Sequence, residues 1–382
     1  MLVYEYKLDG NAIQYQAIEE AIRTVQFIRN TCLRLWMDGT GVSKNDLQTS
    51  CAVLAKEYPF ASRLNSQARQ ASADRAWFAI DRFYTNCLEH KPGKKGYPQF
   101  QHDNRSVEYK ATGWKLEPSG THITFTDGCG IGRLRLVGNK KQKIETFPVK
   151  DIKRVRIIRR ADGYYCQFGV MTQRKIEHVP SDSQLGIDVG LKSFLTDSQG
   201  TTVDNPRHYR KAEKRLKRLG RRLSRKHKQS ANRKKARKAL AKQHLKVQRQ
   251  REDFARKQAN ALVSSHDLIA YENLQIRNMV RTRKLAKSIH DAGWGIFLQW
   301  LAYYGIVHAI PIVAVPPQYT SQKCSGCDTI VNKSLSIRTH ICPTCGLVMD
   351  RDQNAARNIL EKALSTNRGC TGGHSETDGL AP

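Results

Sequence analysis

Apolar residues follow two different periods along the first part of the chain. Residues 2–8 alternate as in a strand, and stretches with the three- and four-residue spacing of helices follow over residues 11–37, 44–57 and 66–88. Apolar side chains at this spacing share one face of a helix, so we expect them to form the core of a helical unit over residues 11–97. The positions concerned are Ile13, Ala17, Ala21, Val25 and Ile28 in the first stretch, and Ala73, Trp77, Ile80, Tyr84 and Cys87 in the last.

The period becomes that of short strands after a segment punctuated by proline and glycine, KPGKKGYPQF, at residues 91–100. Runs rich in β-branched and aromatic residues, divided by turns that contain glycine, continue to Met171. This pattern predicts a small antiparallel β-barrel built from residues 1–10 and 98–180, in which the helical unit is an insertion. Lysine and arginine occupy the polar positions of residues 153–160, where they either face solvent or contact a phosphate backbone.

Buried strands alternate with helical patterns from residue 181 to residue 364. The segments GIDVGLKSF (186–194), LIAYENL (268–274) and AIPIVAVPPQYTS (309–321) are apolar enough to be buried strands. Ala355, Ala356, Ile359 and Leu360 share one face of a last helix. Residues 365–382 are too polar and too rich in glycine to fold by themselves, and we expect them to be disordered. The chain as a whole is therefore predicted to be a multidomain α/β protein.

Positive charge is concentrated within this second region. The chain of 382 residues has 65 Lys and Arg against 34 Asp and Glu, a net charge of +31. Residues 207–251 contain 21 of the basic residues and a single acid, Glu213. Because uncompensated like charge destabilises a helix, this density requires a polyanion, and nucleic acid is the expected partner.

The few apolar residues of the basic segment are regularly spaced. They are Leu216, Leu219 and Leu223, followed at every seventh position by Leu240, Val247, Phe254 and Ala261. The spacing predicts an antiparallel helical hairpin over residues 206–264 with one apolar seam. We expect Arg221, Arg222, Arg225 and Lys226 on its outer surface to contact phosphates.

Four of the ten cysteines have the spacing of a metal site. Cys324 and Cys327 form one C-x2-C pair, Cys342 and Cys345 form another, and fourteen residues separate the pairs. Zinc takes four thiolates tetrahedrally, and a full ligand shell leaves no open position for catalysis. We therefore predict a structural zinc ribbon over residues 320–349 and assign no role to the other six cysteines.

Three carboxylates occupy positions where an acid is costly. Asp188 and Glu272 lie on apolar strands, and Asp352 lies where the last helix begins. Each alone would more often be a surface or capping residue, but a buried carboxylate has to be paired or bind a cation. Together they predict a site for two catalytic Mg²⁺ ions, which hydrolyse phosphodiesters. Asp350 is the alternative to Asp352, which we prefer because it adjoins the helix.

Several classes of protein are excluded. No run of about 18 apolar residues is present, so we expect no membrane span. The first residues, MLVYEYKLDG, do not have the pattern of a signal peptide, and cysteines without an export signal indicate thiols rather than disulfides. We expect a cytoplasmic protein associated with the nucleoid.

The motifs after residue 183 resemble those of the TnpB (OrfB) proteins, which transposons encode and which are compact relatives of type V CRISPR effectors. The segments that carry the resemblance are GIDVGLKSF, YENL, RKLAKSIHDAGW, VPPQYTSQKCSGC, CPTCG and DRDQNAARNIL. In two respects the sequence departs from the family. Ala270 and Tyr271 stand where a second acid often precedes the glutamate, and the helix after Trp294 is shorter than in many relatives.

The resemblance implies a fold and an activity. The implied fold is a RuvC-type RNase H domain over residues 181–364, into which the basic hairpin and the zinc ribbon are inserted. It is preceded by a WED-like barrel and a REC-like helical recognition unit. The implied catalytic triad is Asp188, Glu272 and Asp352. The implied activity is a nuclease that a transposon-end RNA programs and that needs a short motif beside its target.

We therefore expect an RNA-guided, Mg²⁺-dependent endonuclease that cuts double-stranded DNA as a monomer in its ribonucleoprotein. Amide side chains suit adenine edges, so Asn65, Ser66, Gln67 and Gln70 are candidates for reading the adjacent motif. The segment 277–287 is a candidate lid. The alternatives are a strand-transfer transposase, a guided DNA-binding regulator that does not cut, and a plain RNA-binding protein.

Overall fold

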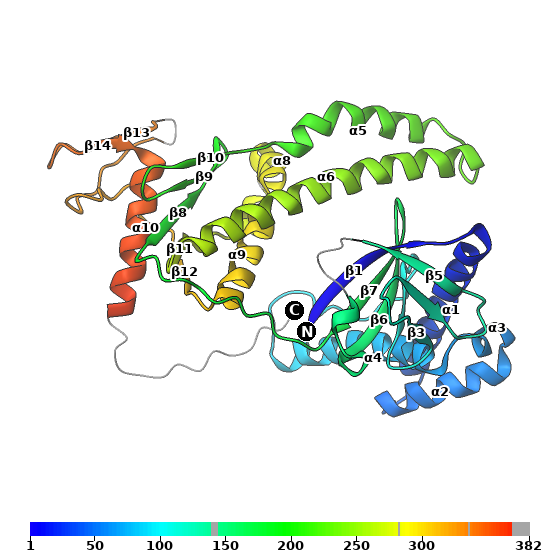
Figure 1. Cartoon of the computed structure of the whole chain (residues 1–382). Helices are drawn as coiled ribbons and strands as arrows, with labels where there is room; N and C mark the ends of the chain where they lie inside the picture. Colours follow the sequence, from blue (N-terminus) through cyan, green and yellow to red (C-terminus); the bar gives the residue numbers. More distant parts are fainter. Residues whose placement is uncertain (139–143, 282, 335–336, 369–382) are drawn as a thin grey trace. The chain divides into compact units, whose positions relative to one another are not determined.

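The computed structural model describes residues 1–138, 144–281, 283–334 and 337–368. The chain forms two compact units, Met1–Gln173 and Arg174–Pro382, each of which has its own core (Figure 1).

The first unit inserts its helices directly after its first strand. Between β1 (Leu2–Asp9) and β2 (Ser106–Tyr109) lie α1 (Ala12–Asp38), α2 (Lys44–Glu57), α3 (Pro59–Ser62) and α4 (Ser66–Leu88). Asn11 and Ser43 cap α1 and α2 through capping boxes, because their side chains accept a hydrogen bond from the third backbone N–H of each helix. The short α3 was not predicted, since a helix of one turn has no period to detect.

The buried face of α1 differs in part from the predicted one. It is centred on Ile22 and includes Ile18, Ala21, Val25 and Ile28. Ile13 is 76% exposed, contrary to the prediction, because nine residues at about 100° each place it on the opposite side of the helix from Ile22. In α4, Tyr84 is also exposed, and its ring contacts that of Trp36.

The strands of the first unit form one antiparallel sheet of seven strands. The remaining strands are β3 (Trp114–Leu116), β4 (His122–Phe125), β5 (Gly132–Val137), β6 (Ile152–Arg160) and β7 (Gly163–Val170). The order is β2-β6-β7-β1-β5-β4-β3, and two short 3-10 turns, Ile144–Thr146 and Val149–Asp151, precede β6. β1 pairs with both β5 and β7, so the first residues lie inside the sheet. Closure of this sheet into a barrel stays a prediction.

The arginines of β6 are largely neutralised within the unit. Arg156 pairs with Glu108 at 2.5 Å, Arg159 with Glu19 at 2.6 Å, and Arg160 with Glu5 at 2.5 Å. Arg154 also lies 3.8 Å from Glu108. Of the two alternatives left open for residues 153–160, these ion pairs favour neither bulk solvent nor phosphate for the four arginines, which already have carboxylate partners, whereas Lys153 donates only to the carbonyl oxygen of Lys150 among the described residues.

The second unit is built on a mixed sheet of five strands. These are β8 (Gln184–Val189), β9 (Ser193–Asp197), β10 (Thr202–Asp204), β11 (Leu268–Glu272) and β12 (Ile312–Val315), in the order β10-β9-β8-β11-β12. β8, β9 and β10 are antiparallel neighbours, whereas β11 is parallel to both β8 and β12. Leu185 and Ile187 pack one face of β8 into a core shared with α6 and α9.

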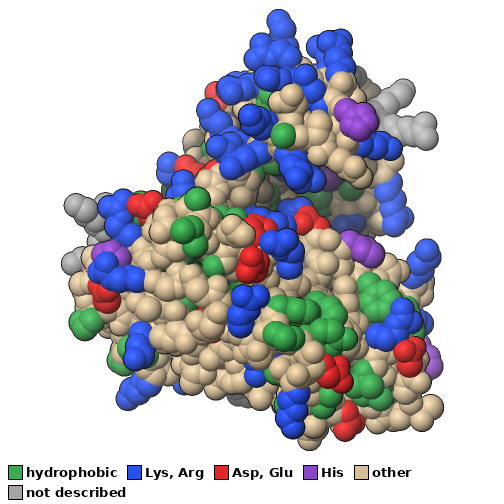
Figure 2. Space-filling model, turned by 90° about the vertical axis from the view of Figure 1, so that its right-hand side faces the viewer, with side chains coloured by type: hydrophobic (Ala, Val, Ile, Leu, Met, Phe, Trp, Pro, Cys, Tyr) green, Lys and Arg blue, Asp and Glu red, His purple; other side chains and the backbone are tan. Residues whose placement is uncertain are grey.

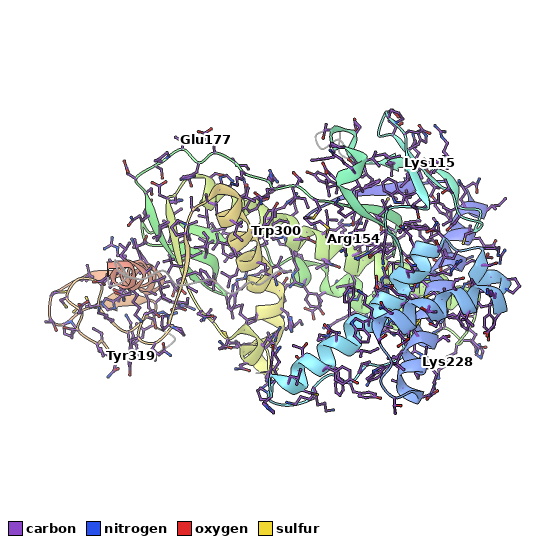
Figure 3. The ribbon with its side chains drawn as sticks, turned by 90° about the horizontal axis from the view of Figure 1, so that it is seen from below. Lys115, Arg154, Glu177, Lys228, Trp300 and Tyr319 are labelled. Atoms are coloured by element: carbon purple, nitrogen blue, oxygen red, sulfur yellow. The ribbon has the colours of Figure 1, made fainter. Side chains whose placement is uncertain are left out.

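The described residues of the second unit also form six helices. They are α5 (His208–Ser224), α6 (Ala231–Ser264), α7 (Ile276–Met279), α8 (Arg283–Ala292), α9 (Trp294–His308) and α10 (Arg351–Arg368). α9 is strongly apolar, and the ring of Trp300, labelled in Figure 3, stacks on Tyr304 at a centroid distance of 5.8 Å. α10 continues to Arg368, so the predicted disordered tail does not begin at residue 365. Residues 369–382 of that prediction lie outside the described residues.

The helices α5 and α6 lie side by side as a hairpin (Figure 1). Its seam buries Leu216 of α5 together with Ala236, Gln243 and Val247 of α6. Beyond Val247 the buried positions are Ala255, Ala259 and Val263, which recur every fourth residue. Ala261 is exposed, so the predicted seven-residue repeat is wrong at this end, where α6 leaves α5 and packs on α9 and the sheet instead. Among the described residues, no helix is long and apolar enough to cross a membrane.

Candidate active site and metal centre

Asp188 and Glu272 lie on one face of the second sheet, on neighbouring parallel strands. Ile187 of β8 is in register with Tyr271 of β11, so the two acids follow one step later at the carboxyl ends of both strands. Side chains two residues apart share a face of a strand. Asp188 therefore lies on the same face as Gly186, and Glu272 on the same face as Ala270, which packs against α10.

α10 covers this face at very short range. A Cβ atom on Gly186 would lie 2.0 Å from the carbonyl oxygen of Ala356, so a side chain at residue 186 would collide with the helix backbone. Only glycine permits this approach. Ala355, Ala356 and Ile359 are buried on the side of α10 that faces the sheet. The contact brings the first turn of α10, which contains Asp352, towards Asp188.

The electrostatics of Asp188 follow from this arrangement. Its side chain is half-buried, and the loss of hydration holds its pKa well above the ordinary range of an aspartate. The neighbouring carboxylates of Glu272, Asp352 and Asp350 raise the pKa further, against the opposing effect of Arg351. Burial also raises the pKa of Glu272, whereas a hydrogen bond from the Thr320 hydroxyl lowers it. The site therefore holds more negative charge than its own surroundings neutralise.

Asp350 and Asp352 have different roles at the start of α10. Asp350 Oδ1 accepts hydrogen bonds from the backbone N–H of Asp352 at 2.8 Å and of Gln353 at 3.4 Å, which is the geometry of a helix cap. The sequence pattern attributed this position to Asp352, which instead lies in the first turn. The Asp352 carboxylate lies 3.0 Å from Arg351 and 3.3 Å from Arg338. Asp350, by contrast, is exposed.

The chemistry of these three side chains fits a hard divalent cation, which prefers carboxylate oxygens. A half-buried aspartate with a raised pKa beside two further carboxylates is an environment that a cation would stabilise. Asp352 already faces two guanidinium groups and Glu272 accepts the Thr320 hydroxyl, so cation binding requires these contacts to rearrange.

The four cysteines converge at one point. Their Sγ atoms all lie within 4.8 Å of one another, and within the described residues no other set of three or more His, Cys, Asp or Glu side chains gathers its ligand atoms in this way. The distances of 3.6 Å between Cys324 and Cys345 and 3.5 Å between Cys327 and Cys342 are close to the ~3.8 Å of thiolates around tetrahedral zinc. Backbone N–H groups of Cys345 and Thr344 lower the pKa of Cys342 to about 6, which favours the thiolate.

The cysteine cluster is attached to α10 by two buried asparagines. Asn354 Nδ2 donates to the carbonyl oxygen of Lys323 at 2.7 Å, and its Oδ1 accepts from the Ser325 N–H at 3.0 Å. Asn358 Nδ2 donates to the carbonyl oxygens of Thr320 and Lys323, both at 2.7 Å. The hairpin of β13 (Thr339–Ile341) and β14 (Val348–Asp350) then leads directly into α10.

These anchoring residues were missed by the sequence reasoning. Asn354 and Asn358 are poor helix formers four residues apart inside a helix, a pattern that indicates side chains used for contacts outside the helix. Thr320, Arg338 and Arg351 carry no comparable signal, because each acts through contacts between segments distant in the sequence.

The predicted phosphate-contacting residues lie at the tip of the hairpin. Arg221, Arg222 and Arg225 are exposed, and Lys226 is half-buried. None of the four takes part in an ion pair between described residues. Arg233 donates to the carbonyl oxygens of Leu223 at 3.1 Å and Lys226 at 3.0 Å and so fixes the turn. Lysine and arginine side chains cover the hairpin in the upper part of Figure 2.

The candidate motif-reading residues lie at the start of α4, and two of them have structural contacts. Asn65 Oδ1 accepts the Gln67 N–H at 2.9 Å and caps the helix. Gln67 Oε1 accepts the Thr112 N–H at 2.9 Å. Reading an adenine requires both the acceptor and the donor of an amide, so these contacts compete with that role. Ser66 is exposed and Gln70 is half-buried.

The candidate lid, residues 277–287, spans parts of α7 and α8; residue 282 lies outside the described residues. α8 is fastened to the base of the basic hairpin. The Asp291 carboxylate, which is 4% exposed, accepts the N–H groups of Tyr209 at 2.7 Å and Arg210 at 2.9 Å. Lys287 forms an ion pair with Glu213. The predicted lid and the hairpin therefore share a set of buried and charged contacts.

Two family models match the second part of the chain. Residues 167–283 match OrfB_IS605, described as "Probable transposase", and residues 294–359 match the "Cas12f1-like, TNB domain" model. The sequence is 39% identical over 185 residues to a "Putative RNA-guided DNA endonuclease" of Streptomyces pristinaespiralis. That match covers 48% of this chain and 46% of the relative, so it spans about half the length of that protein.

A second relative and a solved structure extend the similarity. The chain is 29% identical over 298 residues to "Putative RNA-guided DNA endonuclease InsQ" of Escherichia coli (strain K12), covering 74% of this chain and 71% of the relative. Its fold is similar to that in the "Cryo-EM structure of the Cas12f1-sgRNA-target DNA complex", with a TM-score of 0.51, 14% identity and coverage of 91% and 81%. The chain has a mixed α/β fold of the Cas12 type, and it contains regions that match the OrfB_IS605 and Cas12f1-like TNB domain models.

Proposed function

We propose that the chain is an RNA-guided DNA endonuclease that hydrolyses its target next to a short motif and depends on Mg²⁺. The observation that carries this proposal is the carboxylate site at the ends of β8 and β11. Asp188 has a pKa well above the ordinary range because burial and three neighbouring acids act on it together. Such a site is a poor structural element by itself and a good one for binding cations.

Asp188, Glu272 and Asp352 would hold the ions. Bound Mg²⁺ activates water and stabilises the leaving oxygen in phosphodiester hydrolysis. The other residues of the site orient these ligands. The Thr320 hydroxyl fixes Glu272, and the Arg338 and Arg351 guanidiniums hold Asp352 in the first turn of α10. When the cation binds, we expect the exposed Arg338 guanidinium to pair with a phosphate of the substrate.

The nucleic-acid partners in this proposal are a guide RNA from the transposon end and a double-stranded DNA target. The curated relatives are named RNA-guided DNA endonucleases, and the solved structure contains a guide RNA and target DNA. Base pairing with the guide would select the target sequence, while the protein holds the backbone of the heteroduplex. The exposed arginines of the hairpin tip have no acidic partner among the described residues, which suits phosphate contacts.

In this proposal, different parts of the chain form different functional domains. Residues 181–364 form the RuvC-type nuclease domain, with the hairpin 206–264 and the zinc ribbon 320–349 as insertions. Residues 1–10 and 98–180 form the WED-like part, and residues 11–97 form the REC-like part. The protein would act as a monomer in its ribonucleoprotein, in the cytoplasm at the nucleoid, with zinc in a structural role.

Cleavage by alanine variants tests this function. We expect Asp188→Ala, Glu272→Ala and Asp352→Ala each to abolish cutting of a linear duplex that carries the guide match and motif, while RNA and target binding persist. Asp350→Ala is the matched control, because this exposed residue caps α10 and should retain most activity. Cutting by wild type in EDTA would refute the metal dependence. Joined rather than cut DNA would indicate a strand-transfer transposase, and binding without cutting by wild type would indicate a regulator.

A further inference from the structure

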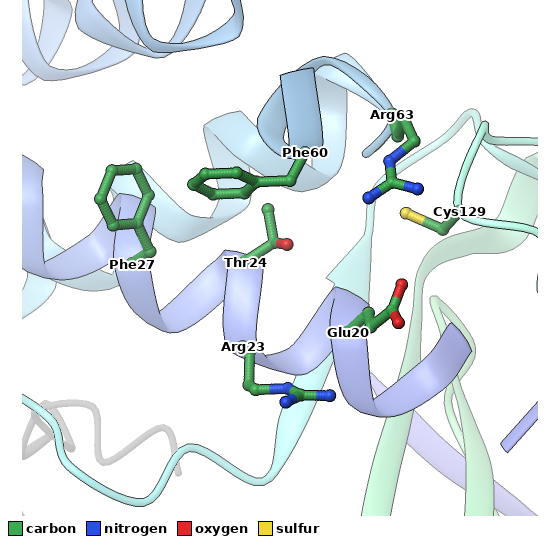
Figure 4. Close-up of a pocket in the computed structure, with 7 residues that line it drawn as sticks. All are labelled: Glu20, Arg23, Thr24, Phe27, Phe60, Arg63 and Cys129. Carbon is green, nitrogen blue, oxygen red and sulfur yellow. The ribbon is translucent and has the colours of Figure 1, made fainter. Parts of the chain in front are cut away.

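A pocket in the first unit has no role in the proposed cleavage. It has a volume of about 400 Å³ and is lined by side chains of α1, of α3 and its C-cap, and of the β4–β5 loop (Figure 4). Four lining residues, Glu20, Arg23, Thr24 and Phe27, recur along α1 at helical spacing and so form a stripe beside its buried face. The others are Phe60, Arg63 and Cys129.

The walls of this pocket are held in place by neighbouring groups. The Arg69 guanidinium donates to the carbonyl oxygens of Ala61 at 3.0 Å and Ser62 at 3.2 Å, which fixes the turn that carries Phe60 and Arg63. On the opposite side, Asp127 accepts the Tyr109 hydroxyl at 2.8 Å and the Cys129 N–H at 3.2 Å. These contacts order the pocket before any ligand arrives, which lowers the entropic cost of binding.

One side of the pocket offers aromatic surface. The rings of Phe27 and Phe60 lie 5.2 Å apart, and Tyr58 contacts both at 5.0 and 5.5 Å. Phe60 is 37% exposed and Tyr58 is 38% exposed, so this cluster is only partly covered by its own unit. Exposed aromatic rings in a concave site are suited to stacking on a flat, polarisable ligand.

The opposite side of the pocket is charged. Arg23 and Arg63 are exposed, and neither takes part in an ion pair between described residues. Glu20 provides one carboxylate, which is too few for a divalent cation site beside two arginines. Glu20 Oε1 accepts from Gln16 Nε2 at 3.5 Å and Arg23 Nε donates to the carbonyl oxygen of Glu19 at 3.3 Å, but an uncharged apolar ligand would leave all three charges without an ionic partner. A ligand that is flat, anionic and rich in hydrogen-bond donors satisfies every group.

We propose that this pocket binds a single unpaired guanine nucleotide. Its ring would stack on the Phe27–Phe60 side, its phosphate would pair with Arg23 or Arg63, and its N1–H and N2–H groups would both donate to the Glu20 carboxylate. Guanine is the base whose Watson–Crick edge presents two adjacent donors, whereas adenine and cytosine present a donor beside an acceptor that a carboxylate repels. A paired base cannot present this edge, so the nucleotide has to be free or extruded. Nothing in this inference depends on DNA cleavage.

Binding of the four nucleoside monophosphates to the full-length protein tests the proposal. Their equal charge cancels the contribution of the basic surface, and 200 mM salt suppresses the remainder. We expect GMP to bind at least about fivefold more tightly than AMP, CMP or UMP. The isosteric Glu20→Gln should remove the preference for GMP, and Phe60→Ala should weaken GMP binding at least about fivefold. Phe78→Ala, which removes an exposed ring of α4 outside the pocket, is the matched control.

A second arm identifies the source of the nucleotide. A duplex with one unpaired guanine is compared with the same duplex fully paired, in wild type and in Glu20→Gln. Tighter binding of the first duplex that is abolished in Glu20→Gln assigns the pocket to an extruded base, whereas a preference confined to GMP assigns it to a free nucleotide. Equal affinity for all four nucleotides, or equal effects of Phe60→Ala and Phe78→Ala, would overturn the proposal. Thermal unfolding of each variant verifies that its fold is intact.

Discussion

At Asp188, the requirements of folding stability conflict with those of the proposed function. It ends a strand whose neighbours are apolar, and α10 closes over it so tightly that residue 186 cannot carry a side chain. Ionising this carboxylate costs the folded state free energy, because hydration is lost and other acids lie near it. A cation bound at this site would remove the cost, as expected of a functional site that is unfavourable for stability by itself.

This conflict predicts the pH dependence of stability at the residue scale. The folded-state pKa of Asp188 lies above its unfolded value, so the native protein retains a proton that the unfolded chain has released. Stability is therefore lost as pH rises through this window, by at most about 1.4 kcal/mol per pH unit. Asp188→Asn cannot ionise, and we expect its melting temperature without divalent ions to exceed that of wild type at neutral pH and to equal it below about pH 4.

The same melting experiments include a cation and a control. Mg²⁺ should raise the melting temperature of wild type at neutral pH and have a smaller effect on Asp188→Asn, since a ligand stabilises in proportion to its affinity for the folded state. Asp204→Asn, an exposed aspartate of the same sheet, controls for a general change in charge. If Asp188→Asn proves less stable than wild type across the whole pH range, a partner group stabilises the Asp188 carboxylate in the folded state, and burial does not destabilise it.

At the scale of single elements, α5 depends on another helix for its first turn. Arg207, at its N-cap position, adopts a left-handed conformation with φ 49° and offers no side-chain hydrogen bond. Asp291 of α8 supplies the missing acceptor to two backbone N–H groups. The direction in which the basic hairpin leaves the sheet is therefore set by a residue about eighty positions later in the chain.

Removing that acceptor should loosen the hairpin at its base. We expect Asp291→Ala to lower the free energy of unfolding by about 1–2 kcal/mol, as when other helix caps are removed, and to increase hydrogen exchange at Tyr209 and Arg210. Ser288→Ala removes only a hydrogen bond from Arg210 at 3.1 Å and is the control on the same helix. Unchanged exchange in Asp291→Ala would mean that α5 is ordered by its packing on α6 alone.

The tip of the hairpin has its own prediction. Neutralising Arg221, Arg222, Arg225 and Lys226 together should weaken RNA binding and reduce the log–log dependence of affinity on salt by about 0.7–0.9 for each phosphate that is no longer neutralised. The control neutralises four surface cations that already have acidic partners, Arg34, Lys91, Arg105 and Arg135. Both variants have the same net charge, so an equal change in slope would show that overall charge rather than the hairpin governs binding.

The elements that could be predicted from the sequence are those whose determinants are local. The bounds of α2 and α4 follow from their caps and their apolar period, and the cysteine cluster follows from ligand chemistry at fixed spacing. Ala261 was predicted in the seam because a heptad describes one partner helix, whereas the end of α6 packs on a sheet. Asp350 caps α10 in place of Asp352. No role could be assigned to Asn354 from the sequence, because its contact depends on where the segment around Lys323 lies.

At the scale of the whole second unit, the metal centre and the carboxylate site are joined by one helix. Asn354 and Asn358 connect α10 to the backbone beside Cys324. Cys345 is followed by two residues and then by β14, which ends at Asp350. Two contacts of α10 thus set the position of Asp352, one with the sheet and one with the cysteine cluster. We therefore expect order in the cysteine cluster to affect the position of the Asp352 carboxylate.

Zinc removal tests this connection. We expect about one zinc per chain in purified protein, and Cys342→Ser should lower the yield of folded protein and increase hydrogen exchange in the first turns of α10. Exchange in α1 and α4, which belong to the other unit, provides the internal control. Well-folded protein that contains no zinc would contradict the structural role. Loss of zinc without any change in α10 would show that the asparagine contacts suffice.

The absence of a side chain at residue 186 also affects the spacing between β8 and α10. Since α10 packs directly on the backbone of Gly186, a Cβ atom at this position would overlap the helix, and the strand that carries Asp188 would have to move away from the helix that carries Asp352. Any larger residue at position 186 would push β8 and α10 apart without replacing any carboxylate of the site. We therefore expect a larger residue at position 186 to change the size of cation that the proposed site prefers.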